Sequence, residues 1–223
     1  SAGRGGSLRA AVFGLSDGLV SNLCLILGVV GASDSPALVL ATGVTGLLAG
    51  AFSMAAGEWV SVRSQRELYE HQISEEREEL ERYPEEEAEE LALIYHARGV
   101  PMEEARTLTR RVLQDPEQAL IALAREELGL NPADLGSPTR AAVASFLAFA
   151  TGALVPLLPF LCSGVFGAFE HGMTIAASLS AFALFLVGAL LSLFSGKNAW
   201  LGGLRLLAIG AAATHRNATS ATQ

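Results

Sequence analysis

The chain has 223 residues, of which 51% are hydrophobic and 17% charged, and its formal net charge at pH 7 is -8. This composition is more apolar than that of ordinary soluble domains, and the negative charge argues against nucleic-acid binding because it repels phosphates. It is typical of a membrane protein with several transmembrane helices.

Two long apolar runs open the chain. Residues 8–31 are interrupted only by Asp17, Asn22 and a few hydroxyl groups, and residues 37–62 are rich in small side chains. Since about 20 apolar residues cross a bilayer as a helix, both runs are predicted transmembrane helices. No Gly or Pro follows between residues 62 and 83, so the second helix is expected to continue unbroken beyond the membrane.

Acidic residues are concentrated in the next block, residues 63–137. It holds nineteen of the 23 Asp and Glu residues of the chain, together with nine Arg. Pro84 suits the first position of a helix, and Asp115 followed by Pro116 suits an N-cap and a first position. We therefore predict a soluble helical domain, with helices over residues 85–98, 102–114 and 116–128 after the continuing second helix.

Three further apolar runs, residues 141–161, 173–194 and 199–213, complete the predicted fold. The sequence thus predicts an all-α membrane protein with five transmembrane helices and an inserted helical domain. Its parts are residues 1–62 (tail and helices one and two), residues 63–137 (acidic metal-binding domain) and residues 138–223 (helices three to five and tail).

The distribution of arginines predicts the orientation. With five spans, the acidic domain lies on the same side of the membrane as Arg4, Arg9 and Arg140, whereas segments 32–36 and 163–172 have no Lys or Arg. The positive-inside rule then places the acidic domain in the cytoplasm.

The positions of some acids indicate that they face inward. A solvated face is the usual arrangement for a run of acids, but Glu76 occupies an apolar position between Ile73 and Leu80. Glu127 likewise follows Leu123 on the apolar face of its helix. These carboxylates are predicted to point toward the interior of the domain or toward a partner.

The turn at Tyr83 predicts which acids meet. In an antiparallel hairpin centred there, Glu76 would face Glu90, and Glu79 would face Glu87, at successive levels about 4.5 Å apart. Clustered carboxylates raise one another's pKa or separate the helices unless a cation lies among them. Ligands that are all oxygen favour hard or borderline ions such as Mg, Ca, Mn or ferrous iron, and they exclude a thiolate zinc site.

One acid lies inside a predicted span. An ionisable side chain in the bilayer is unfavourable and is by default functional, so Asp17 is a candidate for the transport pathway. Glu58 lies near the end of the second span, one turn beyond Met54, and the pair can offer an oxygen and a thioether on one helix face.

Short motifs occur in order along nearly the whole chain: DGLV at 17–20, SMAAGE at 53–58, SVRSQ at 61–65, ELGL at 127–130 and PLLP at 156–159. Together they resemble the vacuolar iron transporter family. The resemblance implies a homodimer of five-span protomers in which Fe(II), and often Mn(II), is exchanged for protons. By the same resemblance, the membrane site falls on Asp17 and Met54, and the cytoplasmic metal ligands fall on Glu76, Glu79, Glu87, Glu90 and Glu127.

Two positions depart from the family's pattern. Plant members carry a carboxylate eight residues before the Met, where this chain has Gly46. Leu123 stands where they have a Met ligand. We hypothesise that Glu58 takes over part of the missing acid's role, and we expect a cytoplasmic site of oxygen ligands with a weaker preference for iron over manganese.

The sequence therefore predicts a divalent-metal transporter that exports or sequesters cytoplasmic Fe(II) or Mn(II), along a path between the first spans of a dimer. It would lie in the cell membrane if the chain is bacterial. No enzyme and no organic cofactor are expected, because no HExxH motif or recognisable nucleophile is present. The alternative is a membrane-anchored metal sensor or interaction module without transport. Asp17 discriminates between them, since an anchor does not need an acid in the bilayer.

Overall fold

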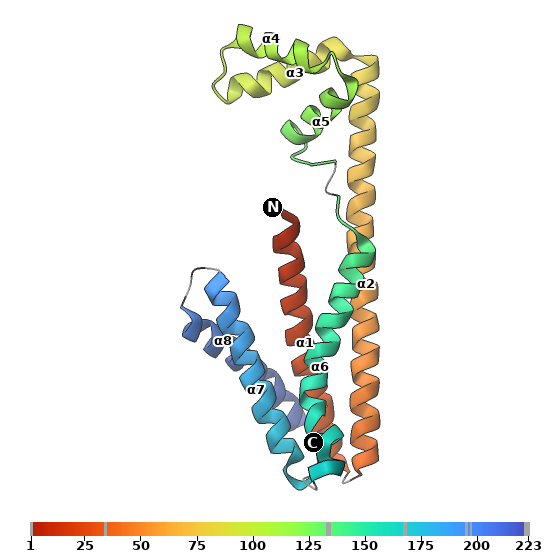
Figure 1. Ribbon diagram of the computed structural model, residues 1–223, viewed down its shortest axis with the longest axis vertical. Coiled ribbons are helices and arrows are strands. Elements are labelled where there is room, and N and C mark those ends of the chain that lie inside the picture. The colour runs from red at the N-terminus through yellow and green to blue at the C-terminus, as the bar shows by residue number, and fades with distance from the viewer. Residues whose placement is uncertain are drawn as a thin grey trace. The chain divides into compact units, whose positions relative to one another are not determined.

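The computed structural model describes residues 2–33, 35–132, 135–166, 169–194, 196 and 198–220. The regular elements in this part of the chain are all helices, as predicted. They are α1 (Ala2–Ala32), α2 (Pro36–Arg82), α3 (Pro84–Ala97), α4 (Met102–Val112), α5 (Pro116–Glu126), α6 (Pro138–Phe166), α7 (Phe169–Phe194) and α8 (Ala199–Ser220), shown in Figure 1.

The helices divide into two compact units. The apolar unit comprises Ser1–Trp59 and Thr139–Gln223, and the acidic unit comprises Val60–Pro138. The continuous helix α2 contributes to both units, and its 47 residues correspond to about 70 Å at 1.5 Å per residue. That is more than twice the roughly 30 Å of bilayer hydrocarbon, so α2 must extend beyond the membrane.

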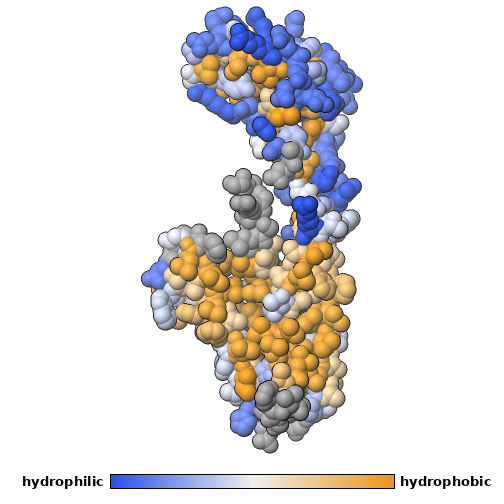
Figure 2. Space-filling view, in the orientation of Figure 1, coloured by the Kyte–Doolittle hydropathy of each residue, from blue (hydrophilic) through white to orange (hydrophobic). Residues whose placement is uncertain are grey.

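Among the described residues, four helices are long and apolar enough to cross a membrane: α1, α2, α6 and α7. Helix α8 contains a shorter apolar stretch, Ala199–Ala211. Large apolar side chains such as Phe52 (65% exposed) and Trp200 (71% exposed) lie on the outside of the apolar unit. Figure 2 shows apolar residues over the surface of this unit and hydrophilic residues over that of the acidic unit. An apolar surface of this extent belongs in lipid, and the chain is an integral membrane protein.

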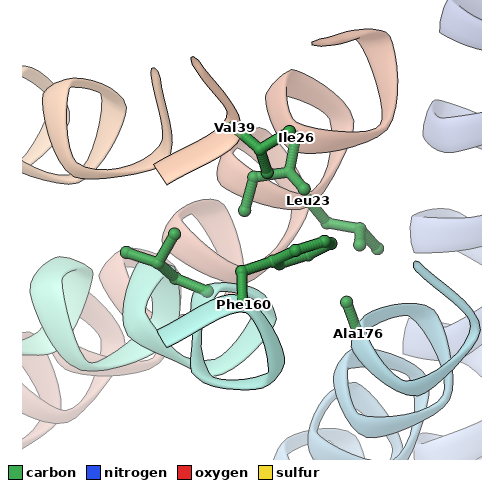
Figure 3. Packing of buried hydrophobic residues seen from close by; sticks show 6 residues of the cluster. Leu23, Ile26, Val39, Phe160 and Ala176 are labelled. Atoms are coloured by element: carbon green, nitrogen blue, oxygen red, sulfur yellow. The ribbon is translucent and has the colours of Figure 1, made fainter. Parts of the chain in front are cut away.

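A buried apolar cluster holds four of the helices together. Leu23 and Ile26 of α1, Val39 of α2, Phe160 of α6 and Ala176 of α7 converge on it, as Figure 3 shows. These side chains are at most 6% exposed. The cluster fixes α1, α2 and α6 around the space described below.

Helices α1 and α6 cross at close range because glycines face the contact. A Cβ atom on Gly18 would lie 2.3 Å from the backbone oxygen of Phe149, and one on Gly152 would lie 2.1 Å from that of Leu15. Small residues at such positions let helix backbones touch within membranes. The glycine of the DGLV motif therefore serves packing and brings Asp17 close to α6.

We expect Gly18→Ala to lower the melting temperature of the detergent-solubilised protein. Overpacking typically costs about 1–3 kcal/mol, and here the obstacle is backbone that cannot rotate away. Gly28→Ala on the same helix is the matched control, because a Cβ atom there meets nothing within 4 Å. Equal melting temperatures for the two variants would show that the α1–α6 contact is not tight.

The boundaries of the helices in the acidic unit follow the predicted signals. Pro84 and Pro116 each occupy the first position of a helix. The Asp115 side chain accepts hydrogen bonds from the backbone amides of Glu117 and Gln118, at 3.0 and 3.3 Å. Gly99 follows α3 with φ +100°, a conformation that glycine adopts readily. These caps confirm the predicted helix starts to within one residue.

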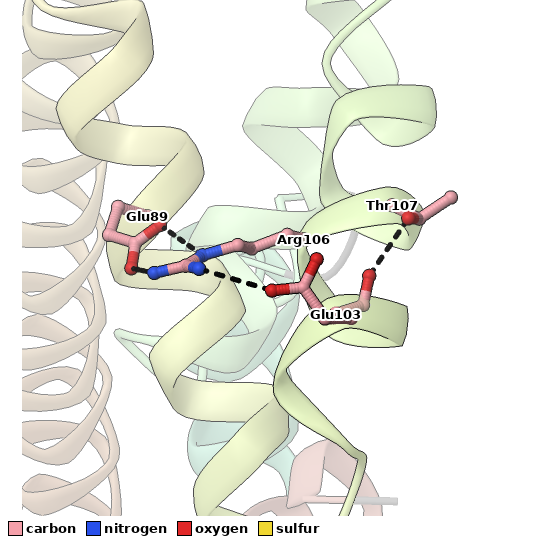
Figure 4. Close-up of polar contacts among 4 residues, drawn as sticks. All are labelled: Glu89, Glu103, Arg106 and Thr107. Carbon is pink, nitrogen blue, oxygen red and sulfur yellow. Dashed lines mark hydrogen bonds and ion pairs between the residues drawn. The ribbon is translucent and has the colours of Figure 1, made fainter.

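An arginine joins α3 to α4. Arg106 donates to both carboxylate oxygens of Glu89, with N–O distances of 2.6 and 3.0 Å, and it also contacts Glu103 (Figure 4). The hydrogen bonds from Arg106 lower the pKa of Glu89 below its ordinary value. Glu89 is therefore a fully charged and paired carboxylate, unlike the acids described next.

Candidate metal sites

Three carboxylates from three helices meet in the acidic unit. Glu76 of α2, Glu87 of α3 and Glu127 at the end of α5 each offer an oxygen atom, and these atoms lie within 4.8 Å of one another. Glu76 and Glu87 are 5% and 7% exposed, whereas Glu127 is exposed. Oxygen ligands bind Mg²⁺ and Ca²⁺ at about 2.0–2.6 Å, so oxygens on opposite sides of one ion lie about 4–5 Å apart. The three acids can share a divalent cation.

The electrostatics of this cluster oppose full ionisation. Burial, and next the charge of Glu127, raise the pKa of both Glu76 and Glu87 to about 7. Burial, followed by Glu90 and Glu79, raises the pKa of Glu127. Glu79 and Glu90 thus act on the cluster through their charges. The unfavourable charge density would be relieved by protons or by a cation.

None of the three acids has an arginine partner within the part of the chain that the structure describes. A buried oxygen of Glu76, Oε2, has no hydrogen-bond partner there either. Glu127 caps the C-terminal end of α5, where the helix dipole disfavours a negative charge. The arginine–carboxylate pairs among the described residues of this unit are Arg63–Glu67, Arg66–Glu70, Arg82–Glu78, Arg98–Glu126, Arg106–Glu89 and Arg106–Glu103. A cation in the cluster would satisfy the unpaired carboxylates.

The acids meet differently from the predicted hairpin pairs. Helix α3 runs across the end of α2 rather than back along it, as Figure 1 shows. The structure consequently brings Glu76 together with Glu87 and Glu127, in place of the expected pairs 76 with 90 and 79 with 87. Glu79 and Glu90 are exposed, and they lie outside the group of three.

We expect metal-free protein to lose stability in the acidic unit as pH rises from about 4.5 to about 7. The folded-state pKa of Glu76 and Glu87 is raised above the ordinary 4.5 to about 7, so their stabilising contribution is complete below 4.5 and disappears as pH rises through 7. The exposed Glu89–Arg106 pair has the opposite pH dependence, because it stabilises the unit more as pH rises. Its contribution to stability is small, since solvent screens the pair.

Hydrogen exchange of the α3 amides, corrected for intrinsic rates, measures this effect. In the presence of a chelator, protection around Leu91 should be greater at pH 5 than at pH 7.5, and Mn(II) should restore it at pH 7.5. Greater protection at pH 7.5 without metal would contradict the proposed charge repulsion.

A second candidate site lies in the apolar unit. A cavity of about 280 Å³ lies between α1 and α2, with Phe149 of α6 on its wall, and both Asp17 and Met54 line it. The other lining residues are Ser21, Asn22, Leu25, Gly46, Gly50 and Ser53. Two residues that the sequence analysis assigned to the membrane site therefore share one cavity, although they are 37 positions apart in the chain.

Helical periodicity explains why these residues share the cavity. Asp17 and Ser21 are four positions apart on α1, and Gly46, Gly50 and Met54 repeat at the same interval on α2, so each set lies on one helix face. The two glycines leave the α2 face without side chains at their positions. Carboxylate, hydroxyl, amide and thioether groups thus surround a space that can hold a cation of borderline softness.

Two of the findings were not anticipated. Glu58 lies one turn beyond Met54, but it is not among the residues that line the cavity, so the cavity lends no support to the hypothesis that Glu58 replaces the acid absent at Gly46. Asn22 lines the cavity, although in the sequence it is only a polar interruption of an apolar run. The feature of the sequence that could have indicated this role is the presence of an amide side chain in an otherwise apolar span.

Comparison with known proteins gives a family model and several relatives that agree with one another. The model of the VIT family matches residues 8–219. A vacuolar iron transporter of Acanthamoeba castellanii is 37% identical over 212 residues, which are 95% of this chain and 76% of that protein. Vacuolar iron transporter 1 of Oryza sativa subsp. japonica is 30% identical over 93% of this chain and 81% of its own length. The protein of the same name from Arabidopsis thaliana is also 30% identical, over 93% of this chain and 82% of its own length.

Proposed function

The chain belongs to the VIT family, and from that premise we propose that it carries a divalent metal ion, Fe(II) or Mn(II), across a membrane in exchange for protons. The observation that carries this proposal is the cavity shared by Asp17 and Met54 within a unit of apolar helices. The names of the relatives support iron as the cargo. Manganese is included because both candidate sites offer mainly oxygen ligands.

The acidic unit captures the ion in this proposal. Glu76, Glu87 and Glu127 are its ligands, because their oxygens already lie within 4.8 Å of one another. Glu79 and Glu90 complete the site, or they attract the cation through their charge. Since two of these groups have a pKa of about 7, metal binding near neutral pH displaces protons.

In this proposal the ion crosses the membrane by way of the cavity in the apolar unit. Asp17 supplies a negatively charged oxygen and Met54 a thioether, which suits Fe(II) and Mn(II) better than Ca²⁺ or Mg²⁺. Within hydrocarbon a carboxylate is unfavourable unless it is paired or protonated. Asp17 therefore alternates between a metal-bound and a protonated state, and that alternation couples metal movement to proton movement.

The proposed assembly is a homodimer of five-span protomers. Helix α8 provides the fifth span through its apolar stretch Ala199–Ala211. The acidic unit lies in the cytoplasm, as the arginine distribution favours. The metal ion moves along the first spans of the two protomers, at the dimer interface. Asp17 is exposed on one protomer, as expected for a residue that faces such an interface. The protein would then remove or sequester cytoplasmic metal.

Flux into proteoliposomes under an imposed pH gradient tests the proposal. Fe(II), Mn(II) and Co(II) should enter vesicles that are acidic inside faster than vesicles without a gradient, and the lumen should become more alkaline as metal enters. Metal entry that is independent of the gradient would contradict proton exchange while retaining metal transport.

A further inference from the structure

Asn22 is an almost fully buried amide on α1, with an exposure of 2%. Its Nδ2 donates a hydrogen bond of 2.7 Å to the backbone carbonyl of Ala153 on α6. Because a carbonyl oxygen only accepts hydrogen bonds, the amide nitrogen must face Ala153, and Oδ1 must face away from it. The hydrogen bond thereby fixes the orientation of the amide.

The amide oxygen has no partner of its own. Oδ1 of Asn22 is buried without a hydrogen bond among the described residues, which is unusual for a polar atom in a protein interior. It points toward α2 at Gly46, where a Cβ atom would lie 2.8 Å from it. Asn22 and Gly46 both line the cavity that contains Asp17 and Met54. The unpaired oxygen therefore lies against Gly46 at the wall of this cavity, where only a residue without a Cβ atom leaves it room.

We propose that Oδ1 of Asn22 is a ligand of the transported cation, beside Asp17 and Met54. This inference rests on the proposed function. Cations of this class bind oxygen at about 2.0–2.6 Å, so an ion in the cavity next to Gly46 can reach Oδ1. A methyl group at the position of the Gly46 Cβ atom would collide with Oδ1. Gly46 is then required for access to the ligand.

Asn22 would contribute an oxygen donor without a negative charge. Among the residues that line the cavity, Asp17 is the only carboxylate, so the proposed ligand set combines one charged oxygen donor with one neutral oxygen donor and a thioether.

A change of ligand softness tests this role in proteoliposomes. Asn22→Cys replaces an oxygen with sulfur, which prefers softer ions. The KM for Mn(II) should rise about tenfold or more, a loss comparable to those caused by changes around metal ligands, while the KM for Cd(II) should fall. An amide that only supports the fold would not reverse the preference between two ions. An unchanged ratio of the two KM values, with wild-type flux intact, would overturn the inference and leave the proposed function standing.

A second variant keeps the amide and its hydrogen bond to Ala153. Gly46→Ala places a methyl group 2.8 Å from Oδ1 and 2.7 Å from Cδ2 of Leu25, and it should raise the KM for Mn(II) about tenfold or more. Ser180→Ala is the control, because its hydroxyl is also buried without a partner but does not line the cavity. Wild-type KM in Gly46→Ala would count against the inference even if Asn22→Cys failed to fold. A wild-type protein that carries no metal would instead refute the proposed function, and this inference with it.

Discussion

Asp17→Asn is expected to reduce metal flux into proteoliposomes to the level of protein-free vesicles. The substitution preserves size but removes the only ionisable carboxylate among the residues that line the cavity. A divalent cation that enters an apolar environment without a compensating charge meets a large desolvation penalty. Proton exchange is lost as well, because the amide does not titrate.

The fold should tolerate this change. Asp17 is exposed on the protomer, and its neighbour Gly18, not Asp17 itself, makes the close contact with α6. The variant should therefore elute from size exclusion as the wild type does and should still bind Mn(II) at the acidic unit. Wild-type flux in Asp17→Asn would remove this residue from the mechanism.

The double variant Glu76→Gln/Glu87→Gln is expected to have two effects of opposite sign. Binding of Mn(II) to the acidic unit should weaken by more than about tenfold, since changes around metal ligands alone cause losses of that size. The metal-free unit should become more resistant to unfolding at pH 7.5, because two buried and mutually repelling carboxylates become neutral. Titration calorimetry of the full chain in detergent, with Asp17→Asn as background to remove the membrane site, measures the first effect.

Glu89→Gln is the matched control for that experiment. Glu89 lies in the same acidic run, but its carboxylate is paired with Arg106. Its replacement should leave Mn(II) binding unchanged and should weaken the contact between α3 and α4. Equal loss of binding in the control and in the double variant would mean that general negative charge, rather than the three-carboxylate cluster, attracts the metal.

Local signals predicted the helices well, because they act over a few residues. The absence of Gly and Pro between residues 62 and 83 correctly predicted that α2 runs unbroken to Arg82, and Asp115 with Pro116 predicted the start of α5. Gly99 and Gly129, which follow α3 and α5, adopt positive φ in the structure, as glycines at helix ends commonly do.

Contacts between helices were harder to predict, because they depend on crossing directions that no local pattern specifies. The assumption of an antiparallel hairpin paired Glu76 with Glu90, whereas the direction of α3 brings Glu76 to Glu87 and Glu127. The cavity in the apolar unit likewise depends on where the glycines of α2 face α1. Asn22 can be identified as a candidate ligand only from its hydrogen bond to Ala153, which shows that the amide oxygen points away from α6.

The central claim is that the acidic cluster and the cavity at Asp17 serve one travelling cation. Entry of Mn(II) into sealed vesicles, measured on the same purified protein whose Mn(II) binding is titrated, tests it most directly. We predict saturable, protein-dependent entry whose KM rises when Glu76 and Glu87 are both replaced with Gln. A protein that binds Mn(II) but admits none to the vesicles would contradict the claim and would instead indicate a membrane-anchored sensor.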